Sequence, residues 1–296
     1  MAFSQQQNLF ELERARPVIN VASVPQRSPF RYPGGKTWLV PYIRSWLKSL
    51  KARPTLFVEP FAGGGIVSLT VAAENLAERV LMVELDEQVA AVWQTILGGD
   101  AGWLAEQIVS FKLTSENAAE ALSKPTQSIR GQAFQTILKN RIAHGGILAP
   151  GAGIIKDGEN GKGIRSRWYP ETLRDRILGI EALKERITFA QGDGVAVMRE
   201  HAKLQSAAFF IDPPYTVDGK KAGKRLYTHN KLSHQSLFDV AASLAGDFLM
   251  SYDDAEAVHR LANQHGFNTK LVAMKNTHHA KMSELLIGRT LDWLDS

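Results

Sequence analysis

Short apolar runs that end in an acidic residue recur along this chain, and each is followed by a helical pattern. The first two are "TLFVEPFAGGGIVSLTVAA" (residues 55–73) and "RVLMVELDEQVAAVWQTIL" (79–97). "ERITFAQGDGVAVMREHA" (185–202) and "SAAFFIDPPY" (206–215) supply two more runs, and residues 233–274 and 283–290 continue the alternation. Strands alternating with helices predict an α/β fold with an open, mostly parallel sheet covered by helices on both faces.

The pattern changes between residues 98 and 186. "DAGWLAEQIVSFKL" (100–113) and "ENAAEALSK" (116–124) favour helices, and the segment after residue 143 opens rich in glycine and ends basic. A long glycine-rich segment within a compact domain is usually functional or mobile. We therefore predict an inserted, mostly helical subdomain over 98–186, a catalytic domain made of 27–97 and 187–296, and an N-terminal extension over 1–26.

Composition narrows the class of protein. The chain has 296 residues and no cysteine, which excludes disulfides, thiolate zinc sites and a cysteine nucleophile and fits a reducing cytoplasm. No apolar run approaches the ~18 residues of a membrane span, and the first residues lack the pattern of a signal peptide. The net charge of +5 is a weak pointer to nucleic acid.

Four acidic residues fall at or near predicted strand ends: Glu59, Glu84, Asp193 and Asp212. One acid there is unremarkable, since caps and turns favour aspartate. Ligands of open α/β sheets bind at the carboxyl ends of the strands. Four acids in succession therefore suggest one shared crevice.

The turn "EPFAGGG" (59–65) joins a strand to a helix, and its three glycines would let a ligand approach the backbone. It does not follow the GxGxxG pattern of a pyrophosphate cradle. Glu84 comes 25 residues after Glu59, where a carboxylate can hold ribose hydroxyls. The combination favours a nucleoside-containing cofactor that lacks phosphates.

"RYPGGKTW" (31–38) contains GGKT and resembles part of a P-loop. A P-loop requires a glycine at position 30, where this chain has phenylalanine. No strand is predicted before it, so the sequence argues against an NTPase.

Three motifs in order identify a family. "PFRYPGGK" (29–36), "FAGGG" (61–65) and "DPPY" (212–215) resemble those of the Dam-like, alpha-order adenine-N6 DNA methyltransferases. The resemblance covers almost all of residues 28–290. It implies S-adenosylmethionine as cofactor, double-stranded DNA as partner, and a target recognition domain in the insertion. Metals and membranes are not implied, and we expect a cytoplasmic monomer or weak dimer.

The resemblance also assigns roles to matching positions. It implies that Tyr32 and Lys36 touch the methionine portion of the cofactor, Glu84 holds its ribose, and Asp193 lies near its adenine. Glu59, Phe61, Gly63 and Gly65 belong to the cofactor turn, and Asp212, Pro213, Pro214 and Tyr215 form the methyl-transfer site. Asp212 is also expected to contact the cofactor. The family usually has tryptophan at the position of Tyr32 and aspartate at that of Glu84, so both chemical types are kept.

The family's chemistry explains the abrupt strand end at "DPPY". Prolines cannot donate to a sheet ladder, so Pro213 and Pro214 must end the strand. A flipped adenine would stack on Tyr215 and donate its two amine N–H groups to Asp212 and to a proline carbonyl. Enzymes that methylate C5 of cytosine use a cysteine nucleophile, which this chain lacks. At the position of Asp212, enzymes that methylate N4 of cytosine more often carry serine. Enzymes that methylate glutamine, and many that methylate guanine, carry asparagine there. Adenine N6 fits best.

DNA contacts are expected in two segments. "GKKAGKRLYTHNK" (219–231) is basic, and we expect Lys220, Lys221, Lys224 and Arg225 to follow the phosphate backbone. In the insertion, Arg165, Arg167 and Trp168 are candidates for reading bases, although local packing explains the tryptophan equally well. Two alternatives stay open: adenine methylation of RNA, and a non-catalytic DNA-binding module that retains cofactor. Glu284, in "KMSELLI" (281–287), is given only a structural role.

Overall fold

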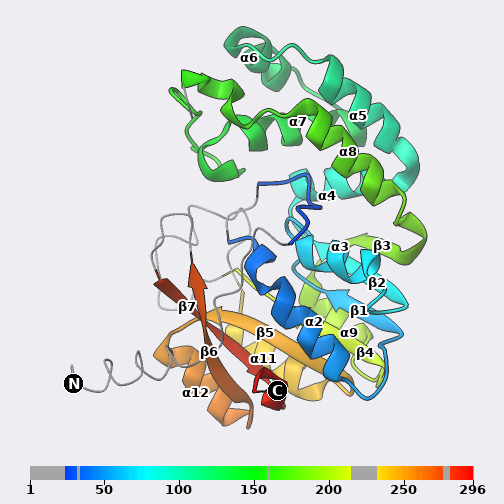
Figure 1. Ribbon diagram of the computed structural model, residues 1–296, viewed down its shortest axis with the longest axis vertical. Helices are drawn as coiled ribbons and strands as arrows, with labels where there is room; N and C mark the ends of the chain where they lie inside the picture. Colours follow the sequence, from blue (N-terminus) through cyan, green and yellow to red (C-terminus); the bar gives the residue numbers. More distant parts are fainter. Residues whose placement is uncertain (1–23, 32–33, 159–160, 215–231, 276–280, 296) are drawn as a thin grey trace, which may run out of the picture.

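A computed structural model describes residues 24–31, 34–158, 161–214, 232–275 and 281–295 (Figure 1). Several predicted site residues lie outside these ranges, so the roles assigned to them stay predictions. These residues are Tyr32, Tyr215, Lys220, Lys221, Lys224 and Arg225.

The predicted α/β class is confirmed by a seven-stranded sheet in the order β3-β2-β1-β4-β5-β7-β6. The strands are β1 (Leu56–Glu59), β2 (Arg79–Glu84), β3 (Ile187–Gln191), β4 (Ala207–Ile211), β5 (Asp247–Asp253), β6 (Asn268–Lys275) and β7 (Lys281–Gly288). Neighbours from β3 to β5 are parallel, whereas β7 runs antiparallel to both β5 and β6. The order reverses between β1 and β4, where such sheets bind their ligands.

Alternating strand residues build a hydrophobic core on each face of the sheet. Phe57 and Met82 belong to one core, and their neighbours Val58 and Leu81 belong to the other, because successive side chains of a strand point to opposite faces. The first face carries α2 (Val40–Ser49), α3 (Ile66–Ala73) and α4 (Glu87–Thr95). The second carries α9 (Gly194–Glu200), α11 (His234–Ser243) and α12 (Glu256–Gln264).

The segment between α4 and β3 is mainly helical. It contains α5 (Ala101–Ser110), α6 (Ser115–Ser123), α7 (Ile129–Ile142) and α8 (Pro170–Glu181), which gather at one end of the molecule, at the top of Figure 1. Their apolar residues continue the core on the α2–α3–α4 face. None of the described helices has the length and apolar character that crossing a bilayer demands.

Candidate active site

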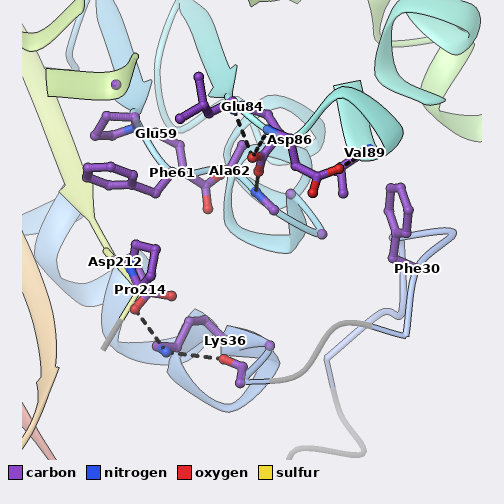
Figure 2. Close-up of a pocket in the computed structure, with 18 of the residues that line it drawn as sticks. Phe30, Lys36, Glu59, Phe61, Ala62, Glu84, Asp86, Val89, Asp212 and Pro214 are labelled. Atoms are coloured by element: carbon purple, nitrogen blue, oxygen red, sulfur yellow. Dashed lines mark hydrogen bonds and ion pairs between the residues drawn. The ribbon is translucent and has the colours of Figure 1, made fainter. Parts of the chain in front are cut away.

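A cavity of about 660 Å³ opens at the carboxyl ends of the central strands. The structure brings Glu59, Glu84, Asp193 and Asp212 to its wall. In Figure 2, Lys36 lies beside Asp212 on one side of this cavity, and Phe30 lies near Val89 on the opposite side. Residues from four strand ends and from the segment before α2 thus face one space.

The glycine turn after β1 is held in a single conformation. Gly65 has φ of 63°, a left-handed value that favours glycine. A Cβ there would lie 2.6 Å from Cε of Met82 and 2.9 Å from Cζ2 of Trp93. The indole Nε1 of Trp93 donates to the carbonyl of Gly63 at 3.0 Å. The core therefore fixes the backbone that the cavity exposes.

Glu84 closes this turn with its carboxylate. Its Oε2 accepts from the amide of Gly63 at 2.8 Å, and its Oε1 accepts from the amides of Leu85 and Asp86 at 2.8 and 2.9 Å. Burial raises the pKa of Glu84, and the backbone amides oppose that rise. The geometry fixes a carboxylate at the second strand end, where the sequence predicts a ribose contact.

Glu59 is a second buried carboxylate, with 4% of its surface exposed. Its Oε2 accepts from the amide of Ser68 in α3 at 2.9 Å. Burial raises the pKa of Glu59 to about 8, with smaller contributions in the same direction from Asp212 and Glu84. A carboxyl with this pKa carries a proton at neutral pH for most of the time.

Asp212 follows β4 directly and belongs to a cluster of charged side chains with Lys36 and Glu284. Nζ of Lys36 lies 3.0 Å from Oδ1 of Asp212 and 3.1 Å from Oε1 of Glu284, which β7 contributes. The Lys36 side chain is 6% exposed. Burial alone would lower the pKa of its ammonium, but the two carboxylates outweigh it and raise that pKa above the ordinary value. One buried cation is thus shared by two carboxylates.

A hydroxyl completes the positioning of Asp212. Oγ of Ser251, in the buried middle of β5, donates to Oδ1 of Asp212 at 2.9 Å. Lys36 and Ser251 therefore both hold Oδ1 of Asp212. Pro213 is buried and Pro214 lies on the cavity wall, so the chain leaves the strand rigidly just after Asp212.

Asp193 has a helix-capping role. Its Oδ1 accepts from the amide of Val195 at 2.9 Å and caps α9. A Cβ on Gly194 would lie 2.0 Å from the carbonyl oxygen of Pro60, so this helix start packs against the turn after β1. Asp193 is exposed on the cavity wall, at the position where the sequence predicts the adenine of the cofactor.

The cavity fits a nucleoside. Phe30 and Phe61 place rings on its wall, and aromatic faces provide flat apolar surface for a base. Glu84 provides acceptors for a ribose diol, and the Gly63–Gly65 turn brings backbone to the surface without side chains. Among the described residues, no group of three or more potential metal ligands occurs.

The insertion residues singled out for DNA are placed differently from one another. Arg165 is exposed and Arg167 is half-buried. Trp168 is only 9% exposed, and its ring packs edge-on against Phe111 with centroids 6.0 Å apart. For the tryptophan, the structure thus shows the local-packing alternative.

The sequence does not show that Ser251 meets Asp212 or that Glu284 meets Lys36. Ser251 and Glu284 lie 39 and 72 positions after Asp212, and Glu284 carries only a structural role in the sequence interpretation. β7 pairs with β5 so that Glu284 stands opposite Asp253. This antiparallel pairing places Glu284 in the active site, and no short sequence pattern around Glu284 predicts that position.

Comparison with known proteins supports one family. Residues 32–128 match the model of the D12 class N6 adenine-specific DNA methyltransferases. No curated protein matches the chain. Among solved structures, the chain is similar to the rRNA methyltransferase aviRa from Streptomyces viridochromogenes, with 13% identity, 89% of this chain and 88% of that chain covered, and a TM-score of 0.38. It is also similar to a methyltransferase from Geobacter sulfurreducens, with 13% identity, coverage of 97% and 96%, and a TM-score of 0.36.

Proposed function

We propose that this protein is a methyltransferase that acts on N6 of adenine in DNA, because residues 32–128 match the D12 class of N6 adenine-specific DNA methyltransferases. The observation that carries the proposal is Asp212. It stands at the end of the central strand β4, beside a rigid Pro-Pro turn, on the wall of a cavity that also fits a nucleoside.

Asp212 would accept a hydrogen bond from the exocyclic amine of the adenine. The amine is a poor nucleophile because its lone pair is delocalised into the ring. Acceptors for both N–H groups, Asp212 and the carbonyl of Pro213 or Pro214, draw the nitrogen towards tetrahedral geometry. Lys36 and Ser251 hold Asp212 in place beforehand, which is electrostatic and geometric preorganisation.

The family implies S-adenosylmethionine as the methyl donor. Its sulfonium would supply the methyl group that the adenine nitrogen attacks. Glu84 would hold the ribose, and Asp193 would lie near the adenine ring of the cofactor. Phe61 and the Gly63–Gly65 turn would line the same half of the cavity. The proton lost from the amine would pass through the hydrogen bond to Asp212.

We assign the polymer contacts to two segments. The basic run containing Lys220, Lys221, Lys224 and Arg225 would provide affinity for the phosphate backbone, which carries little sequence information. Arg165 and Arg167 in the helical insertion would influence which sites are methylated, if their side chains reach base edges. The helices α5–α8 would then serve as the recognition subdomain.

The test is Asp212→Ala in a single-turnover assay of methyl transfer to DNA. The variant should lose transfer, because it removes an acceptor from the amine in the transition state. A thermal unfolding curve like that of the wild type should show an intact protein. Asp295→Ala, which removes an exposed carboxylate, is the matched control. A variant that keeps more than about a tenth of the wild-type rate would contradict the assignment, since that loss is only ~1.4 kcal/mol.

The product identifies the substrate. Nucleosides released from DNA and from RNA, each incubated with wild-type enzyme, should show N6-methyladenine in the DNA sample when analysed by mass spectrometry. Methylated adenine in RNA alone would mean that the polymer is wrong. N4-methylcytosine would mean that the base is wrong.

A further inference from the structure

Residues 27–31, which include the start of the motif containing Lys36, are held by hydrogen bonds from the helical insertion. Arg141 of α7 donates through Nη2 to the carbonyl of Pro29, and Arg176 of α8 donates through Nη1 to the carbonyl of Ser28 at 3.1 Å. The amide of Arg31 donates to Oδ1 of Asn140 at 2.9 Å, and Nδ2 of Asn140 donates back to the carbonyl of Arg31 at 2.9 Å. These hydrogen bonds therefore bring three arginines together.

These arginines form a cationic cluster, defined here as Arg31, Arg141 and Arg176. Burial, and then the neighbouring charges of Arg176, Arg31 and Arg167, lower the pKa of Arg141 to about 9. No carboxylate among the described residues forms an ion pair with a member of the cluster. Arg141 is buried, whereas Arg31 and Arg176 are half-buried, and a buried cation beside two other cations without an anion is costly.

Some of the donors in the cluster have no acceptor. Nη1 of Arg31 and Nε of Arg141 are buried and make no hydrogen bond among the described residues. Arg141 is only 5% exposed. Leaving a hydrogen bond of a buried charged group unmade is unfavourable, because the group has lost its water partners without gaining others. The observed hydrogen bonds to carbonyls hold residues 27–31 against the insertion. Among the described residues, they leave the positive charge of the cluster without an anion and these two N–H groups without an acceptor.

The cluster reaches the active-site cavity. Arg31 and Arg176 line the cavity wall together with Ser28, while Arg141 is buried and close enough for the charges of both to act on it. A Cβ on Gly146 would lie 2.0 Å from the carbonyl oxygen of Arg31, so the loop after α7 packs tightly against the backbone at Arg31. The arginines are therefore held at a rigid place between the insertion and the cofactor side of the cavity.

We infer that Arg31 and Arg176, backed by the charge of Arg141, bind one backbone phosphate of the polynucleotide substrate. The inference rests on the proposed function and adds a contact point to it. The guanidinium fork matches the oxygens of a phosphate, and a phosphate bound here would fix the polymer between the insertion and the methyl-transfer site. The other oxyanion that could enter the cavity is the carboxylate of the cofactor.

The experiment measures the salt dependence of binding to a labelled, mixed-sequence DNA duplex. Arg176→Gln should lower the slope of log affinity against log salt by about 0.9, the value for one lost phosphate contact. Arg174→Gln should leave the slope unchanged. Arg174 lies on the same helix but is exposed and paired with Glu171 and Asp175. Arg176→Lys keeps the charge and should keep most of the slope.

Two further measurements separate the sources of the anion. S-adenosylmethionine should bind Arg176→Gln and Arg31→Gln as it binds the wild type, measured by calorimetry without DNA. A neutral methylphosphonate, moved along the duplex, should at one position weaken binding to the wild type and not to Arg176→Gln. Arg31→Gln supplies the same comparisons should loss of the Ser28 contact prevent Arg176→Gln from folding.

Each outcome decides the inference. Weaker binding of the cofactor by these variants would assign the cluster to the cofactor carboxylate and overturn the phosphate site. Unchanged slopes in both variants, or an equal fall in Arg174→Gln, would overturn it as well, and so would failure of the wild type to bind the duplex. Binding is measured without turnover, so a missing methylated product alone would contradict the proposed function and leave the phosphate site standing.

Discussion

Lys36 shows how a single residue balances the charges of the site. It lies 3.0 Å from Asp212 and 3.1 Å from Glu284, and the side chains of Lys36 and Glu284 are 6% and 7% exposed. Removing one partner of a buried ion pair leaves an uncompensated charge, which costs more than the pair contributes. Glu284, to which the sequence gives only a structural role, therefore has an electrostatic role next to Asp212.

We predict that Lys36→Met destabilises the fold by about 3–5 kcal/mol, because two carboxylates are left facing each other with no cation. Adding Glu284→Gln should recover at least ~1 kcal/mol, since it removes one of the two charges. Urea unfolding of the wild type, both single variants and the double variant completes the cycle. A double variant less stable than Lys36→Met would show that the carboxylates do not repel each other.

Glu59 makes stability depend on pH. Its pKa is about 8 in the folded protein and 4.5 in its ordinary state, so between these values the folded chain holds a proton that the unfolded chain releases. Folding stability must then fall as the pH rises from 4.5 to 8. Below pH 4.5 both states are protonated, and the penalty disappears.

We therefore predict that Glu59→Gln, which keeps an acceptor for the Ser68 amide, gains stability over the wild type as the pH rises. The gain between pH 5 and pH 8 should be roughly 1–4 kcal/mol, measured by urea unfolding at three pH values. Glu106→Gln changes an exposed carboxylate on α5 and should give no such trend. A flat difference for Glu59→Gln would mean that the carboxyl is ionised throughout.

At the scale of elements, the β1–α3 turn joins the core to the cofactor side of the cavity. The strand ends at Glu59, the backbone turns through Gly63 and Gly65, and α3 begins at Ile66. Trp93 of α4 and Met82 of β2 pack beneath the turn. Strand, turn and two neighbouring elements therefore set the position of one ligand-facing backbone segment.

We predict that Gly65→Ala destabilises the protein by roughly 2–4 kcal/mol, adding the cost of a left-handed backbone to that of overpacking. Cofactor binding should weaken as well, because the turn must shift away from Met82 and Trp93. Gly98→Ala is the control, since nothing lies within 4 Å of the Cβ that it would add. Urea unfolding and calorimetry measure the two effects, and a Gly65→Ala protein with wild-type stability would contradict the packing argument.

At the scale of the whole molecule, the site is assembled from distant parts of the chain. Glu59 ends β1 and Asp212 directly follows the neighbouring strand β4, and these two strands are about 150 residues apart in sequence. Asn140 is fully buried and bonds to Arg31 and to the carbonyl of Gly146. It thereby ties residues 27–31, and with them the start of the motif containing Lys36, to the insertion, and so aligns the proposed recognition helices with the proposed methyl-transfer site.

The sequence alone determined the features that depend on neighbouring residues. Alternation of apolar runs with helical patterns predicted the α/β sheet, because burial on both faces requires such runs. The glycines after Glu59 and the prolines after Asp212 predicted a turn and a strand end through their own backbone preferences. These backbone preferences act within a few residues, so they can be inferred from the sequence without knowing the fold.

Only the tertiary structure decided which side chains meet across the sheet, and which ones meet between the helical insertion and the rest of the chain. Glu284 reaches Lys36 through the antiparallel register of β7 with β5, and Arg141 and Arg176 reach residues 27–31 through the packing of the insertion. Trp168, a candidate for DNA contact by residue type, is buried instead. Charges and hydrogen bonds act over a few ångströms in space, so partners more than 100 residues apart become visible only when the chain is folded.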